Sequence, residues 1–276
     1  MQQLRAISGG IVRGTDLDGA SSGVTITANA TLNTKGSYTE LLASTPYQAN
    51  AIILNFRGVH TPASTTAFLM DIAVGAGGSE VVIGENLIAS SHTSNGSPAS
   101  VITIVHPIPQ GTRISARCQA NPGSSQMIVQ GFLNSSASQG SMDVTTTYGA
   151  STPFSGGTDV DPGAVANTKG AWAELGTSGP AGVRQLSIGV GPRLQDRAAE
   201  VTNWQIDIGI GAAGSEHVIV PDWPVSTSEG IGVILPVISP IIDVSIPSGT
   251  RIAARARSSS TAALTRIIDV IGYGVA

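Results

Sequence analysis

Hydrophobic and polar residues alternate along this chain in short runs, and the runs occur twice. Residues 68–74 (FLMDIAV) and 204–210 (WQIDIGI) place apolar side chains around a central aspartate, and residues 100–106 (SVITIVH) alternate in the same way. A period of two is typical of a strand with one buried face. No segment has the period of an amphipathic helix. The pattern therefore predicts an all-β protein.

Other short β-rich runs, bounded by glycine, proline or polar residues, bring each half to about seven or eight strands. They cover residues 51–56, 80–83, 112–118 and 126–133, then 185–190, 216–220, 238–246, 250–256 and 265–273. Glycine-rich turns at 75–78 and 211–214 predict hairpins. We expect two antiparallel β-sandwiches, of the jelly-roll or immunoglobulin-like type.

Three phrases recur in the same order, at offsets of 134, 136 and 138 residues. They are NTKG (33–36 and 167–170), DIAVGAGGSE/DIGIGAAGSE (71–80 and 207–216) and PQGTRISAR/PSGTRIAAR (109–117 and 247–255). Such a long period indicates a repeated domain rather than a solenoid unit. We predict a lead-in at 1–28, a sandwich at 29–133, a linker or second lead-in at 134–160 and a second sandwich at 161–276. GTDLD (14–18) and GTDVD (157–161) suggest that the duplicated unit includes a lead-in strand.

Composition adds that the surface is poor in charge. Charged residues make up 12% of the chain, against a typical ~25%. Such a surface is costly to keep soluble as a free monomer, so other subunits are expected to cover much of it. The net charge of −4 and the two lysines give no basic patch for nucleic acid. Arg251, Arg255 and Arg257 alternate along one predicted strand and line one of its faces.

The charges that both copies retain are the first candidate site. They are Lys35 and Lys169, Glu40 and Glu174, Asp71 and Asp207, Glu80 and Glu216, Arg113 and Arg251, and Arg117 and Arg255. One interpretation is a binding site in each domain. We favour the other, a set of ion pairs that fixes strand register, because a buried mid-strand aspartate needs a partner and an arginine fork suits it.

No metal, cofactor or catalytic residue is predicted. The GTDxD aspartates (Asp16, Asp18, Asp159 and Asp161) lack the further ligands of a calcium loop and are expected to form turns. The histidines (His60, His92, His106 and His217) lack zinc spacing. The chain has neither a GxSxG nucleophile elbow nor a phosphate loop.

Sugar chemistry has two sets of candidate residues. Glycosidase carboxylates are available as Glu80 with Glu85, or Asp71 with Glu80. The tryptophans Trp172, Trp204 and Trp223 occupy positions where the first copy has Tyr38, Phe68 and Leu87. That correspondence predicts core or hairpin anchors rather than a sugar platform.

The single cysteine, Cys118, excludes an intramolecular disulfide, and the second copy has Ala256 there. We expect a buried, inert thiol. The start of the chain lacks a basic segment followed by an apolar run, and no stretch reaches ~18 apolar residues. The expected protein is therefore made and folded in a cytoplasm, without a membrane span.

The retained phrases, in a chain rich in Ala, Gly, Ser and Thr, resemble small β-sandwich virion proteins of tailed bacteriophages. That resemblance implies a non-enzymatic structural subunit on a tail or capsid surface, assembled in the host cytoplasm. Its implied partners are other virion proteins and further copies of itself. The alternatives are a glycan-binding module for host attachment and, third, a hydrolase of cell-wall glycan.

Overall fold

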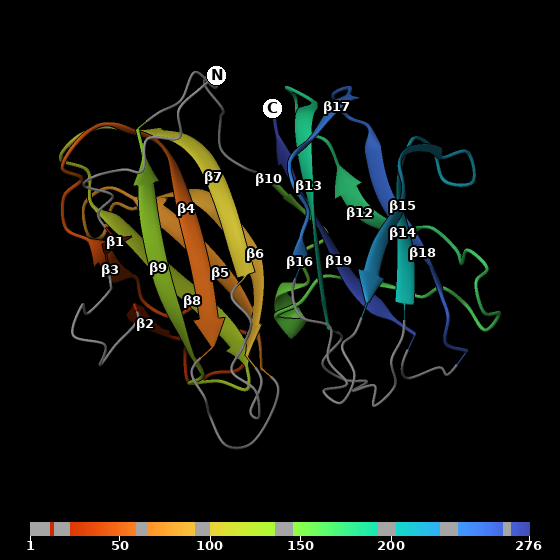
Figure 1. The fold of residues 1–276 in the computed structure, drawn as a ribbon, viewed down its shortest axis with the longest axis horizontal. Coiled ribbons are helices and arrows are strands. Elements are labelled where there is room, and N and C mark those ends of the chain that lie inside the picture. The colour runs from red at the N-terminus through yellow and green to blue at the C-terminus, as the bar shows by residue number, and fades with distance from the viewer. Residues whose placement is uncertain are drawn as a thin grey trace.

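The computed structural model describes residues 12–13, 23–58, 66–91, 100–135, 146–192, 203–226, 237–261 and 266–276. Within these ranges the chain forms two β-sandwiches that stand side by side (Figure 1). The only helical segment described there is one turn of 3-10 helix, η1 (Thr152–Phe154). None of the described helices could cross a bilayer. The prediction of tandem antiparallel sandwiches is confirmed.

In the described ranges, the first sandwich contains nine strands in two sheets. Its strands are β1 (Val12–Arg13), β2 (Val24–Thr27), β3 (Thr39–Leu42), β4 (Ala49–Gly58), β5 (Thr66–Val74), β6 (Val81–Ser91), β7 (Ser100–Ile108), β8 (Ile114–Asn121) and β9 (Gln126–Asn134). One sheet has the order β1-β9-β4-β7, and β2 also pairs with β9. The other sheet has the order β3-β8-β5-β6.

The second sandwich repeats this arrangement. Its strands are β10 (Thr146–Tyr148), β11 (Thr158–Val160), β12 (Ala173–Thr177), β13 (Val183–Pro192), β14 (Asn203–Ile210), β15 (His217–Ser226), β16 (Val237–Ile238), β17 (Ile242–Ile246), β18 (Arg251–Ser258) and β19 (Ile268–Val275). One sheet has the order β10-β19-β13-β16, with β11 on β19 and β17 on β13. The other has the order β12-β18-β14-β15.

The strand order identifies the type of sandwich. Let β1 and β2 share the first position of the first copy, β10 and β11 that of the second, and β16 and β17 the sixth. Both copies then place positions 1-8-3-6 in one sheet and 2-7-4-5 in the other. An immunoglobulin sandwich would keep its first two strands in the same sheet. Here they lie in opposite sheets, and the chain crosses between sheets as in a jelly roll. Of the two expected types, the structure has the jelly roll.

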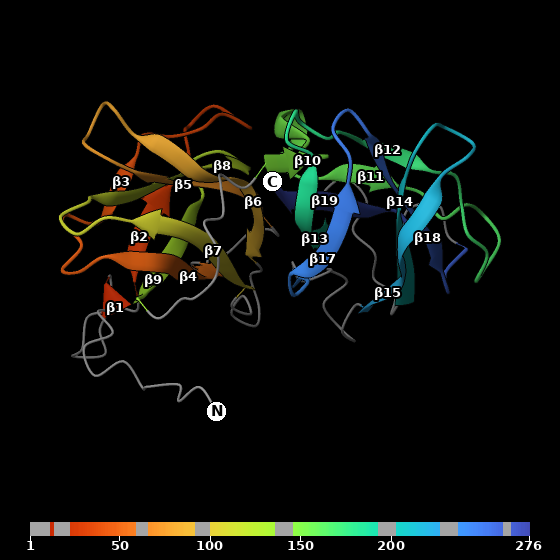
Figure 2. The same ribbon diagram turned by 90° about the horizontal axis from the view of Figure 1, so that it is seen from above.

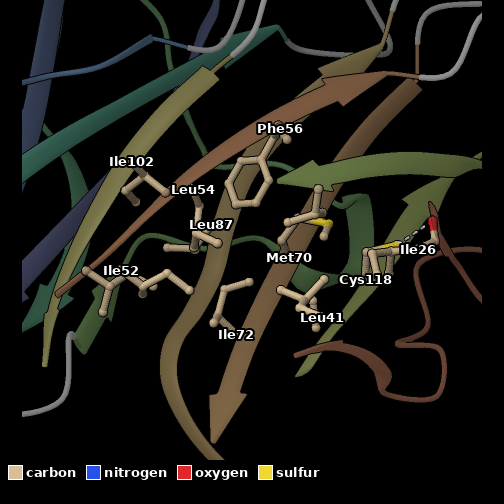
Figure 3. Close-up of a cluster of buried hydrophobic side chains, with 14 of the residues drawn as sticks. Ile26, Leu41, Ile52, Leu54, Phe56, Met70, Ile72, Leu87, Ile102 and Cys118 are labelled. Atoms are coloured by element: carbon tan, nitrogen blue, oxygen red, sulfur yellow. Dashed lines mark hydrogen bonds between the residues drawn. The ribbon is translucent and has the colours of Figure 1, made fainter. Parts of the chain in front are cut away.

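In each sandwich, alternate residues along the strands point inward and form the core. In the first, Ile52, Leu54 and Phe56 of β4 face Met70 and Ile72 of β5 (Figure 3). Phe68 of β5 belongs to the same cluster, and all six are buried. In the second, the corresponding residues are Leu186, Ile188 and Val190 with Trp204, Ile206 and Ile208. Burying each such side chain contributes about 1.5–3 kcal/mol, which makes these alternating positions the main source of stability.

The glycine-rich phrases close the predicted hairpins. Gly75 and Gly78 lie between β5 and β6 with φ of 108° and 83°, and Gly211 and Gly214 have φ of 113° and 82°. Residues with a Cβ atom rarely adopt a positive φ, so glycine is retained at these positions. The strand that follows each turn is longer than predicted, because it continues beyond a bulge at which the register shifts.

Each sandwich has a lead-in strand that pairs with its last strand. In the second sandwich β11 pairs with β19, with Val160 opposite Ile268. In the first, β2 takes this place, with Ile26 opposite Met127. Residues 158–160 therefore correspond to residues 24–26, whereas GTDLD (14–18) lies outside the described residues. The expected lead-in strand is thus present in both copies, as β2 and as β11.

The two sandwiches meet face to edge. The outer face of β10-β19-β13 packs on β6, the edge strand of the first sandwich (Figure 2). The Tyr273 hydroxyl accepts a hydrogen bond from the Ile88 backbone N–H at 2.7 Å and donates to the Asn86 carbonyl at 3.2 Å. An edge strand offers unpaired backbone groups, and Tyr273 satisfies two of them.

Glycines make this approach possible. Gly189 and Gly191 of β13 point out of the second core, and a Cβ at either would press on the Ile88 side chain. The first sandwich has Asn55 at the position of Gly189. Outside the sheets, the Gln119 side chain donates to the Thr152 carbonyl at 2.6 Å, which ties η1 to the first sandwich. The junction thus combines apolar packing with specific hydrogen bonds.

Candidate functional site

The retained charges gather on the outer face of one sheet in each sandwich. In the first, Asp71 of β5 is 1% exposed. Its Oδ1 accepts hydrogen bonds from Lys35 Nζ at 2.6 Å and from the Asn86 backbone N–H at 3.0 Å, and its Oδ2 accepts one from Arg117 Nε at 2.9 Å. Arg117 lies directly opposite Asp71 in the pairing of β5 with β8. The ion pair therefore joins β5 to β8 in the register in which Asp71 and Arg117 face each other.

The NTKG segment delivers the lysine. The backbone N–H groups of Asn33 and Gly36 donate to carbonyls of β8, at 3.0 Å and 2.8 Å. Asn33 has φ of 54°, which asparagine tolerates better than most residues. A Cβ at Gly36 would lie 2.7 Å from the Thr27 carbonyl oxygen. These constraints place Lys35 over β5, where its Nζ also donates to the Leu69 carbonyl at 3.0 Å, and they explain why the phrase is retained.

The second sandwich reproduces the cluster atom for atom. Asp207 Oδ1 accepts from Lys169 Nζ at 2.6 Å and from the Asp222 backbone N–H at 2.9 Å, while its Oδ2 accepts from Arg255 Nε at 2.9 Å. Asp207 is 3% exposed. The duplication has therefore kept a three-donor cage around a buried carboxylate.

A second retained arginine joins the hairpin to the sheet. Arg113 pairs with Glu40 and Glu80, both at 3.1 Å, through Nε and Nη1. Arg251 pairs in the same way with Glu174 at 3.0 Å and Glu216 at 2.7 Å. Arg113 thus links β3 to the residue before β6, and Arg251 links β12 to the residue before β15. The predicted ion pairing of the retained charges is borne out by these contacts.

Hydrogen bonds keep the carboxylates ionised. The Glu80 backbone N–H, Arg113 and the Gly78 N–H lower the pKa of Glu80 despite partial desolvation. Burial acts to raise the pKa of Glu216 and of Asp207, but hydrogen bonds from the backbone and from arginine or lysine leave both below their ordinary values. Burial also lowers the pKa of Lys35 against the opposing pull of Asp71. The clusters are therefore mutually neutralising, an arrangement suited to holding a sheet together.

One difference between the clusters was not visible in the retained residues. Asn86 and Asp222 occupy equivalent bulges with φ of 52° and 49°. The Asp222 carboxylate is 49% exposed, and it contacts Lys169 Nζ at 2.7 Å and Arg257 Nη2 at 3.5 Å. Retention between copies could not reveal this residue. The sequence did carry one signal for it: the first copy has Asn86 where the second has Asp222. Asparagine and aspartate both tolerate a left-handed backbone better than most residues.

The aromatic residues act as anchors. Arg117 lies over the ring of Tyr38 and Arg255 over that of Trp172, each at 4.5 Å from the ring centre. Trp172 also covers Gly209, where a Cβ would collide with its ring. Trp204 is buried, and its Nε1 donates to the Arg266 carbonyl at 2.7 Å. Trp223 is half-buried against the second core, in place of the fully buried Leu87.

Of the GTDxD aspartates and the histidines, the structure describes Asp159, Asp161, His106 and His217. Asp161 forms the expected turn, since its Oδ1 accepts from the Gly163 N–H at 2.8 Å. The turn prediction is wrong for Asp159, which is the exposed middle residue of β11. Asp16, Asp18, His60 and His92 lie outside the described residues. His106 lies on β7 and His217 begins β15. The described ranges hold no group of three metal-binding side chains.

The remaining candidates are the single cysteine and the carboxylates considered for a glycosidase. Cys118 is fully buried, as predicted, and burial raises the pKa of its thiol to about 12. Its Sγ lies 4.0 Å from the Ile26 carbonyl oxygen (Figure 3). A glycosidase acid needs a raised pKa, whereas the pKa of Glu80 is lowered. Asp71 is held by Lys35 and Arg117.

No family model and no curated protein matches the chain. Among solved structures, PNGF-II is 10% identical over 92% of this chain and 62% of its own, with a TM-score of 0.39. A chain of Broad Bean Stain Virus is 11% identical over 99% and 94%, with a TM-score of 0.40. PNGase F, a glycosylasparaginase from Flavobacterium meningosepticum, is 10% identical over 92% and 96%, with a TM-score of 0.39. None of them assigns an activity or a partner to this chain, which spans about three fifths of PNGF-II.

Proposed function

We propose that the protein is a non-enzymatic structural subunit of a virion, displayed on a capsid or tail surface and acting through contacts with other virion proteins and with further copies of itself. The observation that carries this proposal is the character of the surface. Among the residues that the structure describes, six large apolar side chains are between 43% and 65% exposed: Leu32, Val81, Val101, Phe154, Val165 and Ile241. Exposed apolar side chains on a charge-poor protein favour association.

The charged residues strengthen this interpretation. The acidic and basic side chains retained between the copies are engaged with one another inside each sandwich. They stabilise the sheets. The jelly roll is a fold of viral capsid domains, although it also serves lectins, and a fold alone does not specify a function. The resemblance to virion proteins of tailed bacteriophages is part of the same proposal.

The direct test is to look for the chain in particles. Virions from the source that encodes the protein are banded on a density gradient, treated with protease-free nuclease and analysed by quantitative mass spectrometry. We expect peptides of the chain at many copies per particle, co-migrating with the major capsid or tail proteins. Absence of the chain from banded particles, together with failure of the purified protein to bind them, would overturn the proposal.

Glycan binding is a second candidate, favoured by the polar surface around Asp222. Its carboxylate is 49% exposed and lies beside Arg257, whose side chain is 37% exposed. Such groups can hydrogen-bond sugar hydroxyls. A glycan array with the intact protein tests this function, with Asp222→Ala expected to abolish any binding. Signal that Asp222→Ala leaves unchanged, or no signal for either protein, would remove this candidate.

A further inference from the structure

Strand β6 is the last strand of its sheet among those described, and side chains of the second sandwich bind its free edge. The Thr147 hydroxyl donates a hydrogen bond to the Glu85 carbonyl at 2.6 Å. The Tyr273 hydroxyl accepts one from the Ile88 N–H and donates one to the Asn86 carbonyl. These hydroxyls take the place that the backbone of a neighbouring strand would have in a longer sheet.

The covered part of β6 retains what strand pairing requires. Residues 86–90 (NLIAS) contain neither proline nor a charged side chain. Ile88 lies opposite Leu69 of β5, and its N–H points away from β5 toward the second sandwich. Natural edge strands are protected from other chains by proline, by charge or by a cover. In this part of β6 the cover is the protection that the structure shows.

The equivalent edge strand of the second sandwich, β15, is protected differently. Leu69 lies opposite Ile88, and the corresponding residue Gln205 lies opposite Pro224. Pro224 is exposed, and it lacks the N–H that Ile88 offers to Tyr273. The half-exposed Asp222 adds a charge to the same edge. The exposed edge thus has proline and charge, whereas the covered edge has neither at the matching positions.

The second sandwich is shaped to seat this edge. A Cβ at Gly191 of β13 would collide with the Ile88 side chain. Gly191 lies opposite Asp269 on β19, and the matching residue of the first sandwich, Arg57, lies opposite Ile128 on β9. A sheet of this fold therefore accepts a long side chain at the position. The contact with Ile88, rather than the sandwich fold, requires the glycine.

We propose that the second sandwich is an intramolecular cap on a latent strand-addition site. When the junction opens, β6 of one copy pairs antiparallel with β6 of a second copy. Opening uncovers the same edge in each copy, and two identical edges are self-complementary about a two-fold axis. Pro224 makes β15 a poor partner for the same edge. This inference goes beyond the proposed function, because it holds whether or not the chain belongs to a virion.

The test opens the junction from the second sandwich and leaves β6 unchanged. The double variant Gly191→Arg, Tyr273→Ala should show by sedimentation a mean mass that rises with concentration to about twice that of the parent protein. Adding Ile88→Pro gives β6 the protection that Pro224 gives β15, and the mass should return to that of the parent. Val165→Arg adds the same charge at a residue that is 65% exposed, and it should leave the mass unchanged.

Hydrogen exchange at the Ile88 amide shows which edge associates. In the parent protein Tyr273 protects this amide at every concentration. In the double variant the amide should exchange rapidly when dilute and slowly when concentrated, because a second β6 accepts its hydrogen bond. The proposal fails if the double variant keeps the parent's mass, if it associates despite Ile88→Pro, as a misfolded chain would, or if exchange at Ile88 does not slow with concentration. Particle incorporation is measured separately.

Discussion

At the scale of single residues, the buried carboxylates are the most sensitive positions. Asp207 is nearly without solvent contact and receives hydrogen bonds from Lys169, Arg255 and the Asp222 backbone. Removing one partner of a buried ion pair leaves the other charges uncompensated. The neighbouring Asp222 side chain is half-exposed, and water can replace its contacts.

Asp207→Ala is expected to lower the free energy of unfolding by about 3–5 kcal/mol. Urea unfolding monitored by tryptophan fluorescence suits this measurement, because all three tryptophans lie in the second copy, which contains Asp207. Asp222→Ala is the matched control and should cost no more than about 1 kcal/mol. Equal losses for the two variants would contradict the assignment of Asp207 as the centre of the cluster.

At the scale of elements, arginines connect strands that are distant in sequence. Arg251 joins β12 to the residue before β15, and Arg113 does the same in the first sandwich. These bonds require ionised carboxylates. The lowered pKa of Glu80, Glu216 and Asp207 means that their stabilising contribution is present above the ordinary values of 4.5 and 3.8 and is lost as pH falls through the lower folded-state values.

The melting temperature should therefore be nearly constant from neutral pH to about pH 5 and fall steadily below it. Scanning calorimetry at several pH values measures this change. Glu216→Gln removes one titrating group from the second sandwich, so the variant should start less stable and lose less on acidification. A melting temperature that rises between pH 5 and pH 3 would contradict the proposed pairing.

The Tyr273 phenol makes two hydrogen bonds across the junction between the sandwiches. Tyr273 is fully enclosed, and burial raises the pKa of its hydroxyl well above the ordinary value. Tyr273→Phe leaves the Ile88 N–H and the Asn86 carbonyl without this partner, at a cost of about 1–3 kcal/mol. Hydrogen exchange at the Ile88 amide should accelerate in this variant, while amides in the centre of β14 keep their protection. Unchanged exchange at Ile88 would contradict the described contact.

At the scale of the whole molecule, the two sandwiches are expected to unfold together. Ile88 is 1% exposed and belongs to the apolar cluster that includes Ile271 and Tyr273 of the second sandwich. Ile88→Asp would bury a charge at this junction. We expect one calorimetric transition in the parent protein and two in Ile88→Asp. Val81→Asp, at a 58% exposed position of the same strand, should keep the single transition.

The sequence by itself determined the local structure and the duplication. Alternation around Asp71 and Asp207 defines strands with one core face, and glycines with positive φ define the hairpins. The retained charges could be predicted to pair, because a mid-strand carboxylate between apolar neighbours requires a partner. Each of these inferences depends on contacts that are encoded within a few residues or repeated in both copies.

Only the tertiary structure decided the topology and the roles of equivalent positions. The same alternation fits a jelly roll and an immunoglobulin sandwich, because a strand's pattern does not record which strand lies beside it. Phe132 and Tyr273 occupy matching positions, yet only Tyr273 is enclosed, because the first sandwich covers it. Asp222 likewise acquired its place in the cluster through a bulge in β15 that no local pattern specifies. Burial of an outward-facing residue depends on a neighbour that is distant in sequence.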